Sequence, residues 1–246
     1  MDETQNSIAP AEGERRAMRG YYPQYHLATS LIIKGLLDKS LVKVVLVNPD
    51  AGRVDDILIY STHRLDAYQV KWSIADKYWN YNTDFIKEKS GTPSILNQLV
   101  DGWKRLRRPN MKTVVHLYTN QIPSTYDHLK ISSGTISPSP NHTKYFTEKL
   151  WIRAKSDLEG MINSLSDDWK ELWNDFQELT VLEDEDFIEF IKNCELDLNQ
   201  QLEDTKDYQQ DFDALFKLLV EMVGISDSLT EVELTRDKLL GLLGWT

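Results

Sequence analysis

Apolar residues recur along the first half of the chain in two patterns, one typical of helices and one typical of strands. Spacings of three and four residues, as in Tyr22, Tyr25 and Ile32, predict amphipathic helices. Short β-branched runs predict buried strands, and two runs joined by polar turn residues predict a hairpin. The expected order is helix, strand, hairpin, helix and strand, over residues 15–37, 41–47, 57–60 with 67–72, 94–106 and 113–119. Pro23 is expected to bend or begin the first helix, and Thr92 or Ser94 to cap the second.

After a loop rich in Pro, Ser and Thr over residues 121–143, the pattern becomes helical throughout. Helices are predicted over residues 145–165, 168–179, 185–193, 208–223 and 230–243, the last with Thr230 as N-cap and Glu233 at capping-box spacing. We therefore predict an α/β fold, a mixed β-sheet flanked by helices, with a C-terminal all-helical extension. The expected organisation is a flexible N-terminus at 1–14, an α/β domain at 15–150 and an acidic helical region at 151–246.

The charge of the chain divides at nearly the same place. Residues 1–155 hold 22 Lys and Arg against 15 Asp and Glu, whereas residues 156–246 hold 6 against 24. The net charge of −11 conceals this asymmetry. A basic first part can bind a polyanion, which the acidic second part would repel.

Composition excludes several classes of protein. Cys194 is the only cysteine, which excludes an internal disulfide and a zinc site built from several thiolates. No apolar run approaches the roughly 18 residues of a membrane helix, and the polar N-terminus is no secretory signal. The sequence also lacks a phosphate-binding Gly-rich loop ending in Lys-Ser/Thr, a His-x-x-x-His pair and a Gly-x-Ser-x-Gly elbow. We expect a cytoplasmic protein that does not enter a membrane.

Candidate chemistry is concentrated on the predicted hairpin. Asp56 precedes its first strand, and Gln69 and Lys71 share one face of its second strand because strand side chains alternate. Asp56 with the Gln69 side chain, or with the Val70 carbonyl, offers the oxygen ligands that Mg²⁺ prefers. Lys71 can orient an attacking water or stabilise charge on a phosphate. An exposed hairpin with a cross-strand Asp56–Lys71 ion pair explains the same pattern without chemistry.

Other polar and aromatic residues permit more than one interpretation. On helix spacing alone, Gln24 and His26 suit a solvated helix face, and His63 and His116 are expected to be structural or exposed. The basic cluster consists of Lys104, Arg105, Arg107 and Arg108. It is either a phosphate-binding patch, which would make binding fall steeply with salt, or a helix C-terminus complementing the helix dipole. Six aromatic residues of the second part are expected in the core rather than at a cofactor: Trp169, Trp173, Phe187, Phe190, Phe212 and Phe216.

The order of these motifs resembles a known nuclease superfamily. Asp55-Asp56-Ile57 followed by Gln69-Val70-Lys71 looks like the PD-(D/E)xK restriction-endonuclease superfamily, in the branch with Gln in the second motif, as in Mrr-like nucleases. The surrounding segments are similar to nuclease domains of bacterial antiviral effectors. The matching stretches are Gly20-Tyr21-Tyr22-Pro23-Gln24, Trp103 and Leu117-Tyr118-Thr119-Asn120, so the resemblance covers about residues 18–125.

The resemblance implies a restriction-endonuclease-like fold and a Mg²⁺-dependent DNA endonuclease, with Mn²⁺ as a substitute metal. It implies that Asp56 and Gln69 bind the metal, that Lys71 is catalytic, and that Gln24 positions the substrate or the lysine. The group often carries a further Glu on the first helix or strand, which this chain lacks. Asp55, Asp50 or Glu14 could fill that place, or the site binds one metal.

The resemblance also implies partners. We expect this chain to act in antiphage defence on double-stranded DNA, and, because an unregulated nuclease is toxic, we expect oligomerisation to activate it. The final residues Leu239-Leu240-Gly241-Leu242-Leu243-Gly244-Trp245 resemble an element that precedes an NTPase module in STAND-type antiviral proteins, so we expect a fused NTPase or sensor region; a small protein that ends here is the alternative. Two other functions stay open: a catalytically inactive nuclease-like fold that binds nucleic acid or protein, and a helical assembly scaffold.

Overall fold

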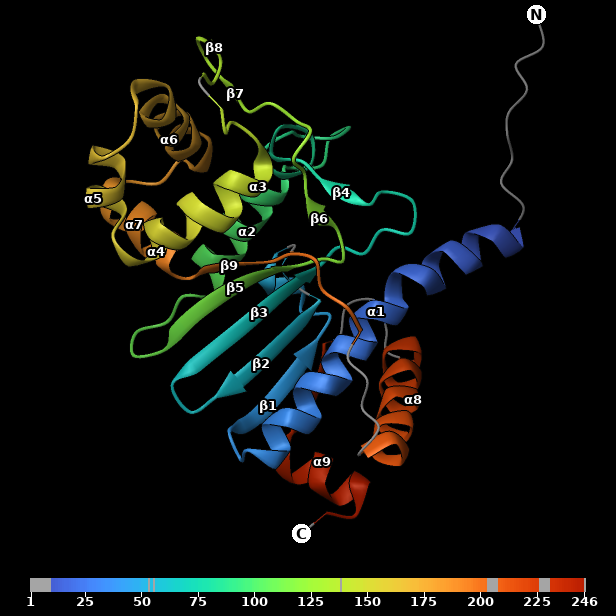
Figure 1. Cartoon of the computed structure of the whole chain (residues 1–246). Helices are drawn as coiled ribbons and strands as arrows, with labels where there is room; N and C mark the ends of the chain where they lie inside the picture. Colours follow the sequence, from blue (N-terminus) through green and yellow to red (C-terminus); the bar gives the residue numbers. More distant parts are fainter. Residues whose placement is uncertain are drawn as a thin grey trace, which may run out of the picture.

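A six-stranded mixed sheet forms the centre of the computed structural model, which describes residues 10–52, 54, 56–137, 139–202, 208–225 and 231–245. The strand order is β10-β1-β2-β3-β5-β9, in which β3, β5 and β9 run parallel and the other neighbours antiparallel (Figure 1). The strands are β1 (Leu41–Leu46), β2 (Ile57–Ser61), β3 (Arg64–Val70), β5 (Lys112–Tyr118), β9 (Cys194–Asp197) and β10 (Val232–Thr235). Two small two-stranded sheets pair β4 (Tyr78–Trp79) with β6 (Ile122–Pro123) and β7 (Lys130–Ile131) with β8 (Gly134–Thr135).

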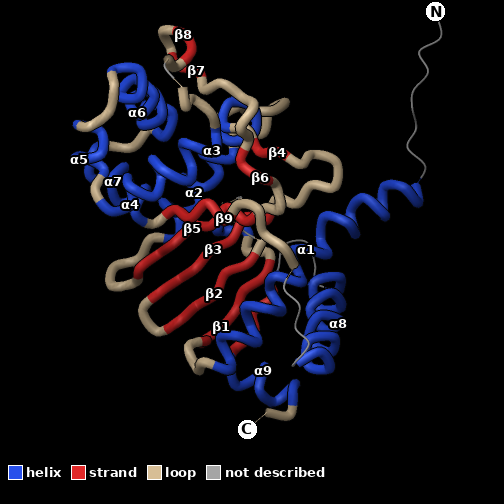
Figure 2. Tube along the Cα trace, viewed as in Figure 1, coloured by secondary structure: helices blue, strands red, loops and turns tan. Residues whose placement is uncertain are grey.

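Helices cover both faces of the large sheet (Figure 2). On one face lie α1 (Pro10–Leu37), α8 (Gln209–Ile225) and α9 (Arg236–Leu243). The opposite face carries α2 (Ile95–Leu106) and a helical layer made of η2 (Tyr81–Phe85), α3 (Thr143–Tyr145), η3 (Phe146–Trp151), α4 (Ile152–Ser156), α5 (Leu158–Asn163), α6 (Asp167–Thr180) and α7 (Asp184–Lys192). A short 3₁₀ turn, η1 (Pro49–Ala51), follows β1. The expected mixed sheet flanked by helices is therefore confirmed.

The predicted elements of the first half are found with small shifts at their ends. The hairpin turns at two residues, so its second strand begins at Arg64 and ends at Val70. The first helix continues through Pro23 and begins at Pro10, inside the stretch that was expected to be flexible; residues 1–9 lie outside the described part of the chain. Ser94 caps α2 as predicted, because its hydroxyl accepts a hydrogen bond from Asn97 N at 3.1 Å.

The prediction that the C-terminal region is entirely helical is wrong. β9 pairs with β5, and β10 pairs with β1, so residues on both sides of the expected boundary near 150 build one sheet. The segment assigned to a helix from Thr230 instead forms β10 and α9. Val232 and Leu234 are buried while Glu233 is exposed, which is the two-residue period of a strand. Thr235 is the N-cap of α9, and Thr230 lies outside the described residues.

The single helix expected over residues 145–165 is divided into shorter segments. The chain leaves helical geometry at Asp157, with φ −154° and ψ 85°, and the Asp157 side chain then accepts a hydrogen bond from Gly160 N at 2.9 Å to start α5. An N-capping side chain competes with helix continuation. Within the described residues, no helix has the length and hydropathy needed to cross a membrane.

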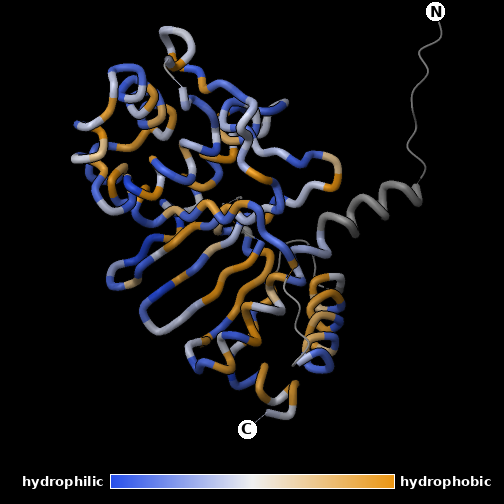
Figure 3. Tube along the Cα trace, in the orientation of Figure 1, coloured by the Kyte–Doolittle hydropathy of each residue, from blue (hydrophilic) through white to orange (hydrophobic). Residues whose placement is uncertain are grey.

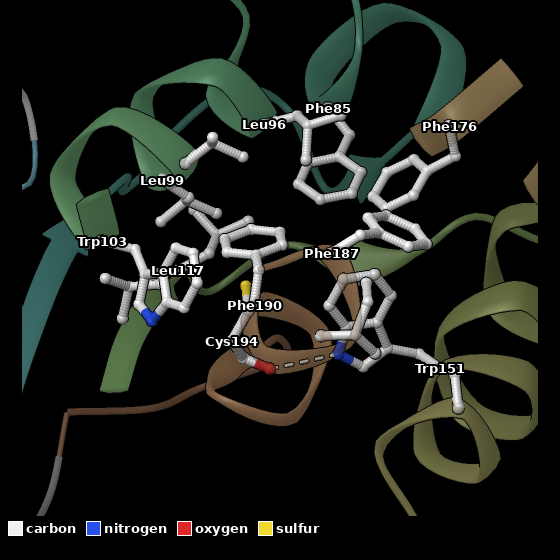
Figure 4. Packing of buried hydrophobic residues seen from close by; sticks show 14 of the residues in the cluster. Phe85, Leu96, Leu99, Trp103, Leu117, Trp151, Phe176, Phe187, Phe190 and Cys194 are labelled. Carbon is white, nitrogen blue, oxygen red and sulfur yellow. Dashed lines mark hydrogen bonds between the residues drawn. The ribbon is translucent and has the colours of Figure 1, made fainter. Parts of the chain in front are cut away.

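Aromatic side chains dominate the core between the sheet and the helical layer (Figure 4). Trp103 of α2 packs on Phe190 of α7, with ring centroids 5.7 Å apart. Trp151 donates from Nε1 to the Cys194 carbonyl at 3.3 Å, which joins the helical layer to β9. The Cys194 thiol is fully buried and burial raises its pKa, so it stays protonated.

A second apolar cluster lies between the other sheet face and the helices α1, α8 and α9. Figure 3 shows that α8 is apolar along much of its length, as expected for a helix packed on a neighbour. Tyr22 and His26 of α1 contact Phe216 and Phe212 of α8, at centroid distances of 5.1 and 4.7 Å. Five of the six aromatic residues expected in the core are buried, and Phe216 is partly buried.

Candidate functional site

The hairpin register places Asp56 beside Gln69. Ile57 pairs with Tyr68 across β2 and β3, so the residue before Ile57 faces the residue after Tyr68. The Asp56 carboxylate accepts two hydrogen bonds at Oδ2, one from Gln69 Nε2 at 2.9 Å and one from the Val70 backbone N–H at 2.7 Å. A two-residue turn leaves little freedom of register. The local sequence of the hairpin therefore fixes this contact.

Lys71 directly follows β3 at the same edge of the sheet. Its backbone N–H donates to the Tyr118 carbonyl at 2.9 Å, which attaches it to the end of β5. Asn120 binds the backbone of Ser73, two residues after Lys71: its Oδ1 accepts from Ser73 N at 3.0 Å, and its Nδ2 donates to Ser73 O at 2.7 Å. The parallel pairing of β3 and β5 thus positions the lysine, which is exposed.

Helix α1 supplies two further residues to this edge. Gln24 donates from Nε2 to the Asp56 carbonyl at 3.2 Å, and Tyr25 lies near enough to Asp56 for its charge to act on the phenol. Burial, with contributions from Tyr21 and Asp56, raises the pKa of Tyr25. The expectation of a solvated helix face is wrong for Gln24 and His26, which are 6% and 8% exposed. Helix spacing could not indicate this, because α8 covers α1 from a distant part of the sequence.

The oxygen atoms around Asp56 suit a hard cation in type. A carboxylate only accepts hydrogen bonds, so the Gln69 amide nitrogen must face Asp56 and Oε1 must point elsewhere. That Oε1 is buried and has no hydrogen-bond partner among the described residues, and such an unsatisfied atom marks a place where a ligand is missing or strain is held. The described residues contain no cluster of three or more His, Cys, Asp or Glu that could hold a metal. Asp56 and Gln69 thus bring together one carboxylate and one amide group, whose oxygens are of the type that Mg²⁺ prefers.

Among the described residues, none of the three acids expected as a further ligand is shown at this edge. Asp55 lies outside them, and so does the Glu14 side chain. Asp50 is described, and it lines a different pocket of about 180 Å³ together with Lys43, Tyr60 and Arg108.

The four residues of the basic cluster differ in their surroundings. Arg105 pairs with Asp101 at 2.8 Å, and Arg107 pairs with Asp186 at 2.5 Å while stacking on Trp103. Lys104 donates to the Val181 carbonyl at 3.4 Å.

The exposed Arg108 makes no ion pair with a described residue. Two members of the basic cluster thus face carboxylates of their own chain, and Lys104 and Arg108 retain free charge for a phosphate.

A buried histidine network on β3, β5 and β9 has no counterpart in the sequence prediction. His116 contacts Asp66 Oδ1 through Nε2 and Asp197 Oδ2 through Nδ1, both at 2.8 Å, and stacks on Tyr68. Both nitrogens must donate to satisfy two carboxylates, so the ring is an imidazolium. Its partners lie 50 and 81 residues away, and such separations leave no signal in a short motif. His116 is therefore structural, and His63 is exposed, as expected.

The network shifts the pKa values of its members. Burial alone would lower the pKa of His116, but the hydrogen bonds to Asp197 and Asp66 outweigh it and raise the pKa. Burial would raise the pKa of Asp66, yet the bonds from His116 and Arg64 lower it overall. Burial and the two nearby carboxylates raise the pKa of Tyr68, so its phenol stays neutral. The charged groups of the network thus bind one another rather than a substrate.

Comparison with known proteins adds no family. The chain matches no protein-family model, and no curated protein sequence is significantly similar to it.

Proposed function

We propose that this protein is a metal-dependent phosphodiesterase that cuts DNA, with Asp56, Gln69 and Lys71 as its working residues. The supporting observation is the 2.9 Å contact between Gln69 Nε2 and Asp56 Oδ2 at the sheet edge from which Lys71 emerges. The contact brings together two polar side chains that are 13 positions apart in the sequence. The motif order that resembles PD-(D/E)xK nucleases is consistent with it.

Each residue has a distinct role in the proposal. Asp56 and Gln69 would hold Mg²⁺, which lowers the pKa of a water and polarises a phosphate when bound. Lys71 presents its ammonium group at the surface, where it orients the water or stabilises charge that develops on the phosphate. Gln24 acts through the Asp56 backbone and is a positioning residue. Double-stranded DNA as substrate, activation by self-association and fusion to an NTPase stay predictions.

One observation favours a second function, a nuclease-like module that binds nucleic acid without cutting it. Two hydrogen bonds from within the hairpin already occupy Oδ2 of Asp56, and Gln69 Oε1 is buried. These two hydrogen bonds stabilise the Asp56 carboxylate without a cation. In such a module the unpaired cations Lys104 and Arg108 would carry the binding, with a strong salt dependence.

Plasmid cleavage in Mg²⁺, Mn²⁺ and EDTA tests the proposal. Asp56→Ala and Lys71→Ala are the active-site variants, and Asp76→Ala and Lys77→Ala are matched controls, because these two exposed residues lie in the nearby connection outside the site. The protein should be assayed both dilute and chemically crosslinked, since self-association is expected to activate it. We expect both active-site variants to lose cleavage and both controls to retain it.

Three outcomes separate the two functions. Full cleavage by either active-site variant rejects the site assignment. Absence of cleavage in every metal and assembly state rejects the enzyme. Duplex binding that persists in EDTA and falls in Lys104→Glu and Arg108→Glu, while Arg105→Glu changes little, then establishes the binding module.

A further inference from the structure

An apolar cavity of about 770 Å³ opens beside the candidate site. Helix α1, the segment after β3 and helix α8 form its walls, with Tyr21, Tyr22, Tyr25, Trp72, Ile74 and Phe216 among the lining residues. We call it the aromatic groove. Its size is within the range of small-molecule and cofactor sites.

Two tyrosines and one isoleucine that line the aromatic groove are exposed to solvent. Tyr21 and Tyr22 are 52% and 50% exposed, and Ile74 is 72% exposed. None of the described lining residues carries a charge at neutral pH. The aromatic groove therefore suits the face of a planar, uncharged ring and offers nothing to a phosphate.

The aromatic groove adjoins the candidate site through two residues. Tyr25 lines the aromatic groove, and the charge of Asp56 contributes, after burial and Tyr21, to the raised pKa of its phenol. Trp72 lines the aromatic groove and comes directly after Lys71; its ring stacks on Tyr118, whose carbonyl holds the Lys71 backbone. A ligand with its phosphate at Asp56 and Lys71 would thus have its adjacent groups at the aromatic groove.

We infer that the aromatic groove binds unpaired nucleobases of the strand whose phosphate lies at Asp56 and Lys71. In an intact duplex the base faces are stacked inside and the phosphates outside, so a duplex has nothing to place among uncharged rings. An unpaired base stacks on aromatic side chains whatever its identity, and each such contact contributes about 1–3 kcal/mol. The inference rests on the proposed function and names its substrate form: single-stranded or locally opened DNA.

The experiment measures binding separately from cleavage. A short fluorescein-labelled oligothymidylate is titrated with the wild-type protein in EDTA, which prevents metal-dependent cleavage, at fixed salt and with a duplex of equal length as competitor. Into this background we introduce Tyr22→Ala, Trp72→Ala and the ring-preserving Trp72→Phe. Tyr126→Ala is the matched control, because Tyr126 is 75% exposed and does not line the aromatic groove. Thermal melting confirms that each variant is folded.

We expect Tyr22→Ala and Trp72→Ala to weaken binding about ten-fold, within the range for loss of one stacked base. Trp72→Phe should bind within about two-fold of the parent, because a ring remains in the aromatic groove. Tyr126→Ala should also bind within about two-fold, because Tyr126 does not line the aromatic groove. Equal affinity of all variants, no binding of oligothymidylate by the parent, or preference for the duplex overturns the inference. A groove variant that lowers self-association in sedimentation instead assigns the aromatic groove to a second copy of the chain, and also overturns it.

The two proposals can fail independently. If wild-type protein cuts nothing while stacking-dependent binding persists, the nuclease assignment fails and the base-binding groove stands. If wild-type protein cuts DNA and the groove variants bind as the parent does, the nuclease stands and the groove assignment fails.

Discussion

Replacement of His116 by phenylalanine tests the buried charge network directly. The ring stacked on Tyr68 at 4.2 Å is retained in shape, while both of its hydrogen bonds are lost. Asp66 and Asp197 then face each other across a ring that cannot donate. His63→Phe is the control, because His63 is exposed and its side chain forms no hydrogen bond with a described residue.

The expected loss follows from the burial of the partners. Removing one member of a buried ion pair costs about 3–5 kcal/mol, because the remaining charge is left without compensation. Asp66 is 13% exposed but keeps its contact with Arg64, and Asp197 is 33% exposed, so water can solvate part of its charge. We therefore expect a loss near the lower limit, about 3 kcal/mol of unfolding free energy.

The loss should depend on pH in a defined direction. The folded pKa of His116 lies above its ordinary value of 6.5, so its contribution to stability is complete below about pH 6.5 and declines as pH rises through the folded pKa. The folded pKa of Asp66 lies below its ordinary value of 3.8, so its contribution declines only as pH falls through that lower value. The difference between wild type and His116→Phe is thus largest from about pH 4 to pH 6.5.

Urea unfolding followed by tryptophan fluorescence measures this difference. With a slope of about 3 kcal/mol per molar urea for a chain of this length, the midpoint should fall by about 1 M at pH 5.5 and by less at pH 9. The His63→Phe midpoint should match wild type at every pH. A difference that is under about 1 kcal/mol, or that grows as pH rises, would refute the imidazolium bridge.

Three other substitutions test the scaffold around the site. Asn120→Ala removes both hydrogen bonds to Ser73; we expect a loss of about 1–2 kcal/mol in thermal unfolding and faster hydrogen exchange after β3, and unchanged exchange would contradict the clamp. Gly102→Ala places a Cβ where Val54 packs, so stability should fall by about 1–3 kcal/mol; a melting temperature equal to wild type would show that the loop before Asp56 yields freely. Ser94→Ala removes the cap of α2 and should cost about 1 kcal/mol, which the same melting assay would disprove if it found no change.

Local patterns predicted the first half of the fold well because its elements depend on near neighbours. β-Branched runs marked β1 and β5, and the Ser94 cap marked the start of α2. β9 and β10 were missed because each has four residues, and so short a strand carries almost no periodic signal. They are strands because β9 pairs with β5 and β10 pairs with β1, at the two edges of the sheet. The partner strand is distant in the sequence, and a local pattern does not include it.

The candidate site was predicted to a similar depth. Asp56 and Gln69 meet as the hairpin pattern indicated, since register and alternation follow from a short stretch of chain. Gln24 reaches the same edge, although helix spacing alone placed it in solvent. Local spacing places Tyr25 on a helix face and Trp72 in a hairpin strand. Their position beside the site depends on the packing of α1 and α8, which local spacing does not show. The acidic partners of Arg107 also come from a distant helix, α7.

The two outer strands make the sheet depend on residues far along the chain. Lys43 on β1 pairs with Glu233 on β10 across 190 residues of sequence, so this edge closes only after β10 has left the ribosome. Until then β1 and β5 present unpaired backbone groups, which are templates for aggregation. A fragment cut at residue 150 would keep those edges open permanently. We therefore expect it to collect in inclusion bodies, while the chain that includes β9 and β10 folds slowly because these strand pairs are distant in sequence.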